Sequence, residues 1–256
     1  MDKKLIESTL NGMGIPCSIQ YFETISSTND YAKELARENC PENTVIIAEK
    51  QTRGRGRMGR TFFSPEKTGL YTSIIIRPSF KAEDALFITP ATAVALNKVF
   101  EKLYGIETEI KWVNDIYKNG KKICGILTES AFKNDGTLDY VIVGIGINLV
   151  KPENGFPDEI SEIAGCVFDT PPENPEKLCA EIISSVITAC NDLSNKDFLN
   201  TYKSRQMLTG KRVILPSEEE VTVLGVDDHC ALIVKDRFGK TLTISSGDVS
   251  VKIVKN

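Results

Sequence analysis

The sequence predicts a fold that mixes helices and strands, followed by a small β-barrel at its C-terminal end. In the first 200 residues or so, β-like runs alternate with stretches whose apolar residues recur at helical spacing. After about residue 208, five short β-like runs follow one another in fewer than 50 residues, separated by turn-forming residues. Short strands of this kind avoid exposed edges by closing into a barrel. We therefore expect one domain over residues 1–208 and a second over residues 209–256.

The predicted strands of the first domain are apolar, β-branched-rich runs bounded by turn formers. They lie at residues 18–22, 45–49, 70–76, 108–113, 123–132 and 138–149. Lys118-Asn119-Gly120-Lys121 and Asn134-Asp135-Gly136 are turn signals that join the last three runs. Residues 151–175 are rich in proline, glutamate and asparagine, so a loop is predicted there.

Three helices are predicted among these strands. Ser26-Ser27-Thr28-Asn29 can cap a helix through Ala32 and Ala36, because side-chain oxygens there satisfy free N–H groups. The other two helices, over about 84–104 and 175–193, each have an apolar face at helical spacing. In the second domain, strands are predicted at residues 211–215, 221–226, 230–235, 240–244 and 249–254.

Composition excludes several classes of protein. The chain of 256 residues has a formal net charge of −4, whereas a protein that binds polyanions over its whole surface is usually basic. Seven cysteines, none in a CxxC pair, and a single histidine predict reduced thiols and no zinc site. No apolar run has the length of a signal-peptide core or a membrane span. We expect a cytoplasmic protein with no membrane association.

The segment Arg53-Gly54-Arg55-Gly56-Arg57-Met58-Gly59-Arg60, the Arg/Gly loop, is the most informative stretch of the chain. Glycine lets backbone N–H groups approach an anion closely, and arginine adds a planar fork of charged donors. An RGG-type nucleic-acid tail or a disordered linker is the alternative interpretation. The β-like runs on both sides favour a loop fixed at a binding site instead.

Three further segments carry polar residues or strand glycines that fit the same site. They are Ser27-Thr28-Asn29, then Lys111-Trp112-Val113-Asn114-Asp115 with Lys122 and Gly125, and finally Gly144-Ile145-Gly146-Ile147-Asn148. Glycine weakens a strand, so two glycines on one face suggest close approach by a ligand. Each segment has a structural alternative. For the first it is a helix cap alone, and for the glycines of the third it is relief of packing against a neighbouring helix. For the second, Lys111 and Asp115 are alternatively surface charges at a hairpin and Trp112 a core residue.

In their order and spacing these segments, together with Gln51, closely resemble the biotin–protein ligases. The resemblance is strong over about 22–150 and extends to Ser246-Gly247-Asp248-Val249-Ser250 near the C-terminal end. It implies an α+β fold, with a mixed, largely antiparallel sheet flanked by helices as in class II aminoacyl-tRNA synthetases. It also implies an SH3-like C-terminal barrel that lies beside the nucleotide and the carrier protein.

The resemblance implies roles for individual residues. Those expected to bind biotin are Ser27, Thr28, Asn29, Gln51, Gly54, Arg55, Gly56, Lys122, Gly125, Gly144 and Gly146. Those expected near the nucleotide are Arg57, Arg60, Phe62, Phe63, Asn114 and Asn148. Catalytic roles are expected for Lys122, Arg57, Lys111 and Asp115, and no side chains are assigned to a metal.

Two residues depart from the usual family pattern. Val113 stands where proline is common, which is expected to loosen the turn before Asn114, and Phe62 stands where tryptophan is frequent. A phenyl ring can still stack or pack there, with less area. Only 26 residues precede Ser27, so we expect the short form of the family, without an N-terminal DNA-binding domain and without specific DNA binding.

The implied activity is a two-step ligation. Biotin and ATP, with Mg²⁺, give biotinyl-5′-AMP, and the biotinyl group then passes to a lysine of the biotin carrier domain of a biotin-dependent carboxylase. A lipoate or octanoate ligase or transferase of related architecture is the alternative, and a nucleic-acid-binding module is a third. The sequence leaves open whether the protein is a monomer or a homodimer.

Overall fold

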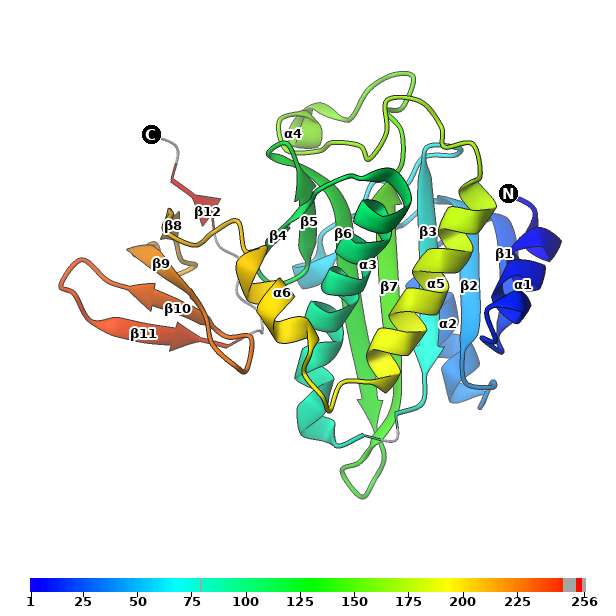
Figure 1. The fold of residues 1–256 in the computed structure, drawn as a ribbon, viewed down its shortest axis with the longest axis horizontal. Coiled ribbons are helices and arrows are strands. Elements are labelled where there is room, and N and C mark those ends of the chain that lie inside the picture. The colour runs from blue at the N-terminus through cyan, green and yellow to red at the C-terminus, as the bar shows by residue number, and fades with distance from the viewer. Residues whose placement is uncertain (79, 246–251, 255–256) are drawn as a thin grey trace.

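The fold contains two β-sheets, a large one flanked by helices and a small one beside it (Figure 1). The structure is a computed structural model, and it describes residues 1–78, 80–245 and 252–254. The large sheet has seven strands in the order β1-β2-β3-β7-β6-β5-β4. Its strands are β1 (Ser18–Ile25), β2 (Thr44–Gln51), β3 (Gly69–Ile76), β4 (Glu109–Lys111), β5 (Asp115–Lys118), β6 (Lys121–Phe132) and β7 (Leu138–Asn148).

Pairing in the large sheet confirms the mixed, largely antiparallel arrangement. Only β1 and β2 are parallel, and every other pair in this sheet is antiparallel. The parallel pair is connected by a crossover helix, α2 (Thr28–Arg37), as parallel neighbours require. The hairpin turns predicted at Lys118–Lys121 and around Asn134–Gly136 join β5 to β6 and β6 to β7.

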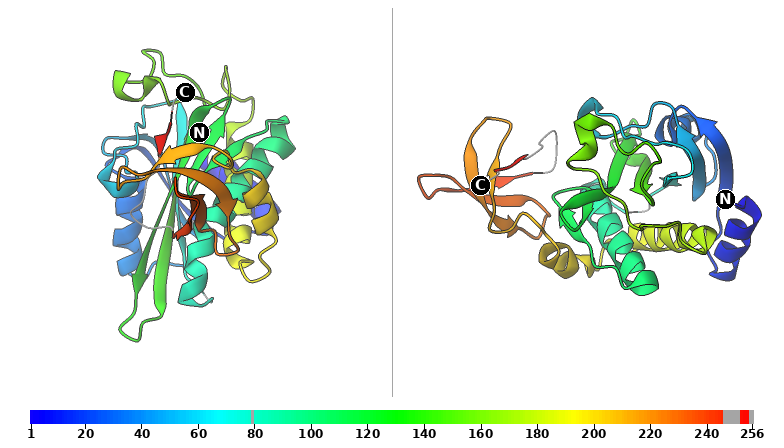
Figure 2. Two further views of the ribbon diagram at one scale, coloured as in Figure 1. Left: turned by 90° about the vertical axis from the view of Figure 1, so that its left-hand side faces the viewer. Right: turned by 90° about the horizontal axis from the view of Figure 1, so that it is seen from above.

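Helices cover both faces of this sheet. On one face lie α1 (Lys3–Gly12), α3 (Ile88–Tyr104) and α5 (Pro175–Asn191), and α2 lies on the other (Figures 1 and 2). The strand residues alternate accordingly: Val45 and Ile47 join the first apolar core, whereas Ile46 packs with Ala32 and Ala36 of α2. A sheet covered on both sides explains why every residue of 44–48 and of β3 is buried, with no exposed residue between buried ones.

Several elements differ from those predicted. Helix α1 occupies a stretch that was expected to be only a short charged segment, and Ile6 and Leu10 bury its apolar side. The predicted strand at 108–113 is two short strands, β4 and β5, separated by a turn at Trp112–Asn114. A further helix, α6 (Phe198–Ser204), was not predicted, and residues 82–87 form the 3-10 helix η2 before α3. Such short elements depend on tertiary packing more than on local pattern.

The small sheet consists of β8 (Arg212–Ile214), β9 (Glu220–Val226), β10 (Leu232–Lys235), β11 (Thr241–Ile244) and β12 (Lys252–Ile253). Its order is β11-β10-β9-β8-β12, and all of its pairs are antiparallel. Among the described residues, β11 and β12 are its outer strands and do not pair with each other. The segment Ser246–Ser250, to which the family resemblance extends, lies outside the described residues.

The two sheets share buried contacts. Ile110 of β4 accepts a hydrogen bond from Met207 N at 2.9 Å and donates one to Arg205 O at 2.7 Å. Trp112 Nε1 donates to Cys230 O at 2.9 Å, so the small sheet reaches the turn between β4 and β5. A single apolar core runs through α3, α5 and the inward side of the small sheet.

Two observations concern the chemistry of the whole chain. All seven cysteines are free thiols, as predicted. Within the described ranges, no helix combines the length and the apolar character needed to cross a bilayer.

Candidate functional site

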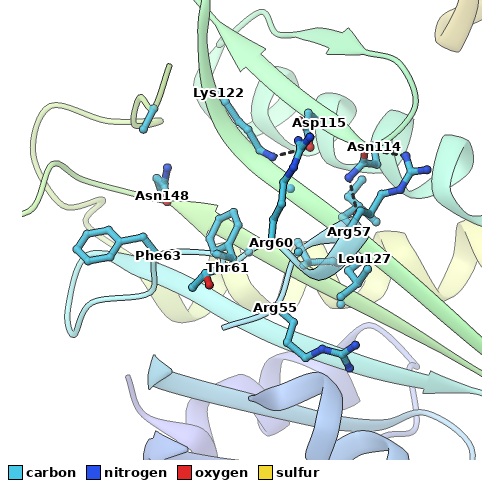
Figure 3. A pocket seen from close by; sticks show the side chains of 18 of the residues that line it. Arg55, Arg57, Arg60, Thr61, Phe63, Asn114, Asp115, Lys122, Leu127 and Asn148 are labelled. Carbon is cyan, nitrogen blue, oxygen red and sulfur yellow. Dashed lines mark hydrogen bonds and ion pairs between the residues drawn. The ribbon is translucent and has the colours of Figure 1, made fainter. Parts of the chain in front are cut away.

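A cavity of about 260 Å³ opens at one end of the large sheet. It is formed by the start of α2, the end of β2, the Arg/Gly loop, the β4–β5 turn, parts of β6 and β7, and residues 156–164 (Figure 3). Nearly all of the predicted site residues line it. They are Thr28, Asn29, Gln51, Arg55, Gly56, Arg57, Arg60, Phe62, Phe63, Lys111, Asn114, Asp115, Lys122, Gly125, Gly144, Gly146 and Asn148.

Two predicted residues, Ser27 and Gly54, do not line the cavity, and their contact with a ligand stays a prediction. Ser27 is buried and caps α2, where its Oγ accepts a hydrogen bond from Asp30 N at 3.4 Å. Gly54 packs against the backbone just after the loop, because its carbonyl accepts a hydrogen bond from Phe62 N at 2.9 Å. A Cβ on Gly54 would lie 2.4 Å from Phe62 O, which explains why glycine is required there.

Neutral polar groups gather at one end of the cavity, the polar end. Gln51 Oε1 accepts from the backbone N–H of Thr28 at 2.9 Å and from its hydroxyl at 3.2 Å. Ser73 Oγ, buried under the helix start, lies 2.8 Å from Thr28 Oγ1 and 2.6 Å from Asn29 Oδ1. Ser73 was missed by sequence reasoning, because a serine inside an apolar strand gives no local signal.

Arg55 lines the cavity, but its guanidinium is held by carboxylates on the α2 side. Its Nη1 lies 2.6 Å from Asp30 Oδ1, and its Nη2 lies 3.2 Å from Glu129 Oε1. Glu129 also accepts from Asn29 Nδ2 at 3.0 Å and from Lys33 Nζ at 2.6 Å. In Figure 3 the Arg55 side chain points away from Lys122. Arg55 therefore fastens the beginning of the Arg/Gly loop to α2 and β6.

The strand glycines make room for side chains of the protein. A Cβ on Gly144 would lie 2.0 Å from Asn29 Oδ1, and one on Gly146 would lie 2.6 Å from the Phe62 ring. Gly125 faces Gly146 across the β6–β7 pair and lies under the same ring. Close approach of a ligand to these glycines stays a prediction. Gly144 accommodates the helix α2, and the other two glycines accommodate Phe62, which forms the floor in the middle of the cavity.

Positive charges gather at the opposite end, the cationic end. Lys122 Nζ lies 2.7 Å from Asp115 Oδ1, and Arg60 extends from the loop into the cavity toward Asp115 (Figure 3). Burial lowers the pKa of the Lys111 ammonium; Asp115 partly offsets this, and the charges of Lys122 and Arg60 lower it further. Among the described residues that line the cavity, Asp115 is the only carboxylate. Repelling cations with one counter-charge favour an anionic ligand.

Arg57 connects the Arg/Gly loop with the β4–β5 turn. Its Nη1 donates to Asn114 Oδ1 at 3.2 Å, and Asn114 Nδ2 donates to Ile126 O at 2.9 Å. The turn is also fixed from outside the cavity by Trp112, and by Tyr202, whose hydroxyl donates to Val113 O at 3.1 Å. These contacts hold the turn that valine in place of proline was expected to loosen.

Residues 156–164 close the far side of the cationic end, and sequence reasoning missed them. Phe156 packs edge-on against Phe63 with ring centroids 6.4 Å apart, and Ile160, Ile163 and Ala164 also line the cavity. These residues lie in the stretch that was predicted to be a plain loop. Isolated apolar residues in a stretch rich in proline, glutamate and asparagine are the only sequence signal for this cover.

The geometry defines what the cavity can bind. Its polar end suits a small neutral group with hydrogen-bonding atoms, the Phe62 floor suits an apolar chain, and its cationic end suits phosphate or carboxylate. Within the described part of the chain, no three histidine, cysteine, aspartate or glutamate side chains gather as metal ligands. No residue beyond Ala164 lines the cavity, so in the described residues the small sheet acts on it only through contacts such as that with Trp112.

Comparison with protein families gives two matches. Residues 21–148, half of the 256 residues, match the biotin/lipoate A/B protein ligase family. Residues 208–252 match the biotin protein ligase C-terminal domain. The first match contains every residue of the predicted site.

Curated relatives agree with these matches. The chain is 40% identical over 179 residues to the bifunctional ligase/repressor BirA of Bacillus subtilis, a match that covers 70% of this chain and 54% of the relative. This chain therefore corresponds to about half of that protein. It is 28% identical over 241 residues to the biotin–[acetyl-CoA-carboxylase] ligase of Mycobacterium tuberculosis, covering 89% of this chain and 86% of the relative.

Solved structures share the fold. A biotin protein ligase from Aquifex aeolicus in complex with biotin and ATP matches with a TM-score of 0.76 and 24% identity, covering 93% of this chain and 99% of that one. A biotin protein ligase from Leishmania major in complex with biotinyl-5-AMP matches with a TM-score of 0.62 and 23% identity, covering 90% and 100%. At these identities the likeness concerns the fold.

Proposed function

Because this chain belongs to the biotin/lipoate A/B protein ligase family, we propose that it activates biotin with ATP and transfers the biotinyl group to a lysine of a biotin carrier protein. One observation carries the proposal: a polar end and a cationic end lie in one cavity, separated by an apolar floor. Biotin has a ureido ring, an apolar chain and a carboxylate, in that order. The polar end, the Phe62 floor and the cationic end fit these three parts in sequence.

The first step joins two anions, the carboxylate of biotin and the α-phosphate of ATP. The carboxylate oxygen attacks the α-phosphorus, and pyrophosphate leaves. We propose that the Lys122 ammonium lies between the two anions, where its compact charge follows the negative charge as it shifts. Arg57 and Arg60 neutralise phosphate oxygens, while Asn114, Asn148 and Phe63 contact the nucleotide. Catalysis in this step is positioning and electrostatics.

In the second step the amine of a carrier lysine attacks the carbonyl of biotinyl-5′-AMP, and AMP leaves. We propose that Asp115, the only lining carboxylate, orients that amine while it holds Lys122. The Arg/Gly loop and residues 156–164 cover the mixed anhydride and slow its hydrolysis by water. The acceptor is proposed to be the carrier domain of a biotin-dependent carboxylase, as the names of relatives suggest for those proteins.

Mg²⁺ is proposed to enter with ATP. One lining carboxylate and several cations do not form a dedicated metal cage, and the set fits a metal that the phosphates carry in. Oxygens of Asp115, Asn114 and Asn148 are the lining groups that could hold it. When bound, Mg²⁺ offsets the charge of the triphosphate.

We also propose a division of the chain at about residue 208, with an SH3-like barrel in the second part and a class II synthetase-like sheet in the first. Support comes from strand pairing, because every pair of named strands lies within one of the two sheets. Seven free thiols support work in a reducing compartment, the cytoplasm.

The decisive test is the exchange of labelled pyrophosphate into ATP. We expect exchange that depends on biotin, with lipoate and octanoate as matched substrates that give none. Exchange with lipoate or octanoate in place of biotin would contradict the assignment of the substrate.

Removing the Arg57 side chain should loosen the cover over the intermediate. We expect Arg57→Gly to form biotinyl-5′-AMP but to release it early, because the contact between the loop and Asn114 is lost. Released adenylate should biotinylate unrelated lysines, as measured with bovine albumin as the acceptor. Arg53→Gly is the matched control, since Arg53 is exposed and does not line the cavity. Complete loss of adenylate formation would show that the first step cannot proceed without Arg57 and would contradict this prediction.

The charge of Lys111 should lower the stability of the free protein while it supports ATP binding. We expect Lys111→Met to weaken ATP binding and to stabilise the free protein by about 0.5 to 2 kcal/mol, since a half-buried charge beside like charges is removed. The folded-state pKa of Lys111 is lowered, so the destabilisation is complete below that pKa. It shrinks as pH rises above that pKa and is gone above about 10.4, the unfolded value. Urea unfolding of both proteins should therefore differ at pH 7 and converge at alkaline pH. A less stable variant at pH 7 would contradict this account.

A further inference from the structure

Lys122 lies at the start of β6, before the first residue of β6 that pairs with β7. Strands β6 and β7 are in register up to the pair Cys124 and Ile147, whereas β6 begins earlier, at Lys121. On its other side, Lys122 is paired with Tyr117 of β5. The strand residue that carries the central ammonium of the site therefore lies beyond the reach of β7.

Another part of the chain, residues 163–167, which we name the bridging segment, fills this gap. Lys122 N donates to Ile163 O at 2.7 Å, and Gly165 N donates to Lys122 O at 2.8 Å. Ala164 thereby forms a parallel bridge with Lys122. The bridging segment is also fastened to the end of β7, because Asn148 Nδ2 donates to Gly165 O at 3.0 Å. One residue, Gly165, thus contacts both Lys122 and Asn148.

Close approach at this point requires a residue without a side chain. A Cβ on Gly165 would lie 2.5 Å from the Cβ of Lys121, closer than real side chains approach. Both atoms are attached directly to the backbone, so the clash can be relieved only if the bridging segment moves away from β6. Such a movement would break the two backbone hydrogen bonds to Lys122 and the contact with Asn148.

We infer that Gly165 is a positioning residue for Lys122, an inference that rests on the proposed function. It acts through its hydrogen bonds to the Lys122 backbone and the Asn148 side chain, and it has no proposed contact with the substrates. The ammonium of Lys122 lies 2.7 Å from Asp115, so a shift of its backbone changes where its charge meets the two anions. Catalysis by positioning is sensitive to displacements of this size.

The test is Gly165→Ala in the full chain. We expect kcat for biotin-dependent pyrophosphate exchange to fall between about 10- and 100-fold. KM for biotin should stay within about twofold, because the polar end around Thr28 and Gln51 lies away from the bridging segment; a twofold change is only about 0.4 kcal/mol. Biotin binding by calorimetry and the thermal midpoint report whether the variant is folded.

Compensating variants separate positioning from general damage. Lys121→Gly removes the Cβ that Gly165→Ala would meet, so the double variant should recover most of its kcat relative to Lys121→Gly alone. Lys121→Ala keeps that Cβ and loses the same ammonium, so its double variant with Gly165→Ala should not recover. Wild-type kcat in a folded Gly165→Ala protein, or equal kcat in the two double variants, would overturn the inference.

Hydrogen exchange of the wild-type protein gives a second test that needs no variant. The amides of Lys122 and Gly165 should be strongly protected, because each donates across the gap. Exchange at the random-coil rate would overturn the inference even if Gly165→Ala failed to fold. Protected amides in a protein without biotin-dependent exchange would instead refute the proposed function.

Discussion

Lys122→Ala should nearly abolish formation of biotinyl-5′-AMP and leave the fold intact. The ammonium lies 2.7 Å from Asp115 at the end of the cavity where two anions are proposed to meet. A charge-assisted contact that strengthens in the transition state is worth about 3 to 4 kcal/mol, so the exchange rate should fall by roughly 10² to 10³. The loss should appear in kcat, since biotin keeps its contacts at the polar end.

The neighbouring lysine provides the matched control. Lys121 lies next to Lys122, but its ammonium turns outward to Glu162 O at 2.6 Å and does not line the cavity. Lys121→Ala should therefore keep nearly all of the exchange activity. A folded Lys122→Ala protein with exchange near the wild-type rate would remove Lys122 from the mechanism.

Gly144→Ala should displace Asn29 and disrupt the polar end of the cavity. Its Cβ would lie 2.0 Å from Asn29 Oδ1, and Asn29 is fixed by Ser73, Leu127 and Glu129. Inserting a methyl group into such a packed site costs about 1 to 3 kcal/mol. We expect that cost in stability. We also expect weaker biotin binding by calorimetry, because the residues proposed to meet the ureido ring are displaced.

Gly12→Ala serves as the control for this substitution. Gly12 ends helix α1, and a Cβ there meets no atom within 4 Å. Its thermal midpoint and biotin affinity should match those of the wild-type protein. Unchanged biotin affinity in Gly144→Ala would show that Asn29 can move aside and that the polar end does not depend on its position.

The chemistry of the site could be predicted from the sequence because it depends on residue types at short spacing. The Arg/Gly loop indicates an anion site wherever it is placed, since both its charge and its backbone freedom are local. The lysine and aspartate of the 111–115 segment and the strand glycines at 144 and 146 were expected in one site, and all of them line one cavity. The long helices and most strands were likewise predictable from periodicity.

The partners of those residues could not be predicted, because they lie far away along the chain. One of the two carboxylates that hold Arg55 is 74 residues away at Glu129, and the carbonyl that holds Trp112 is 118 residues away at Cys230. No local pattern encodes such pairs. The same holds for Gly165, whose need for a bare backbone arises only because Lys121 lies opposite.

The sequence by itself determined which chemistry the protein carries: a cationic loop, a lysine beside an aspartate, polar groups at a helix start and glycines in a buried strand. Only the tertiary structure decided how that chemistry is arranged. It turned Arg55 toward Glu129, set Phe62 over Gly125 and Gly146, and brought residues 156–167 over the cationic end and against Lys122. The physical reason is that charge and backbone freedom belong to single residues, whereas packing and hydrogen-bond satisfaction belong to pairs that folding brings together.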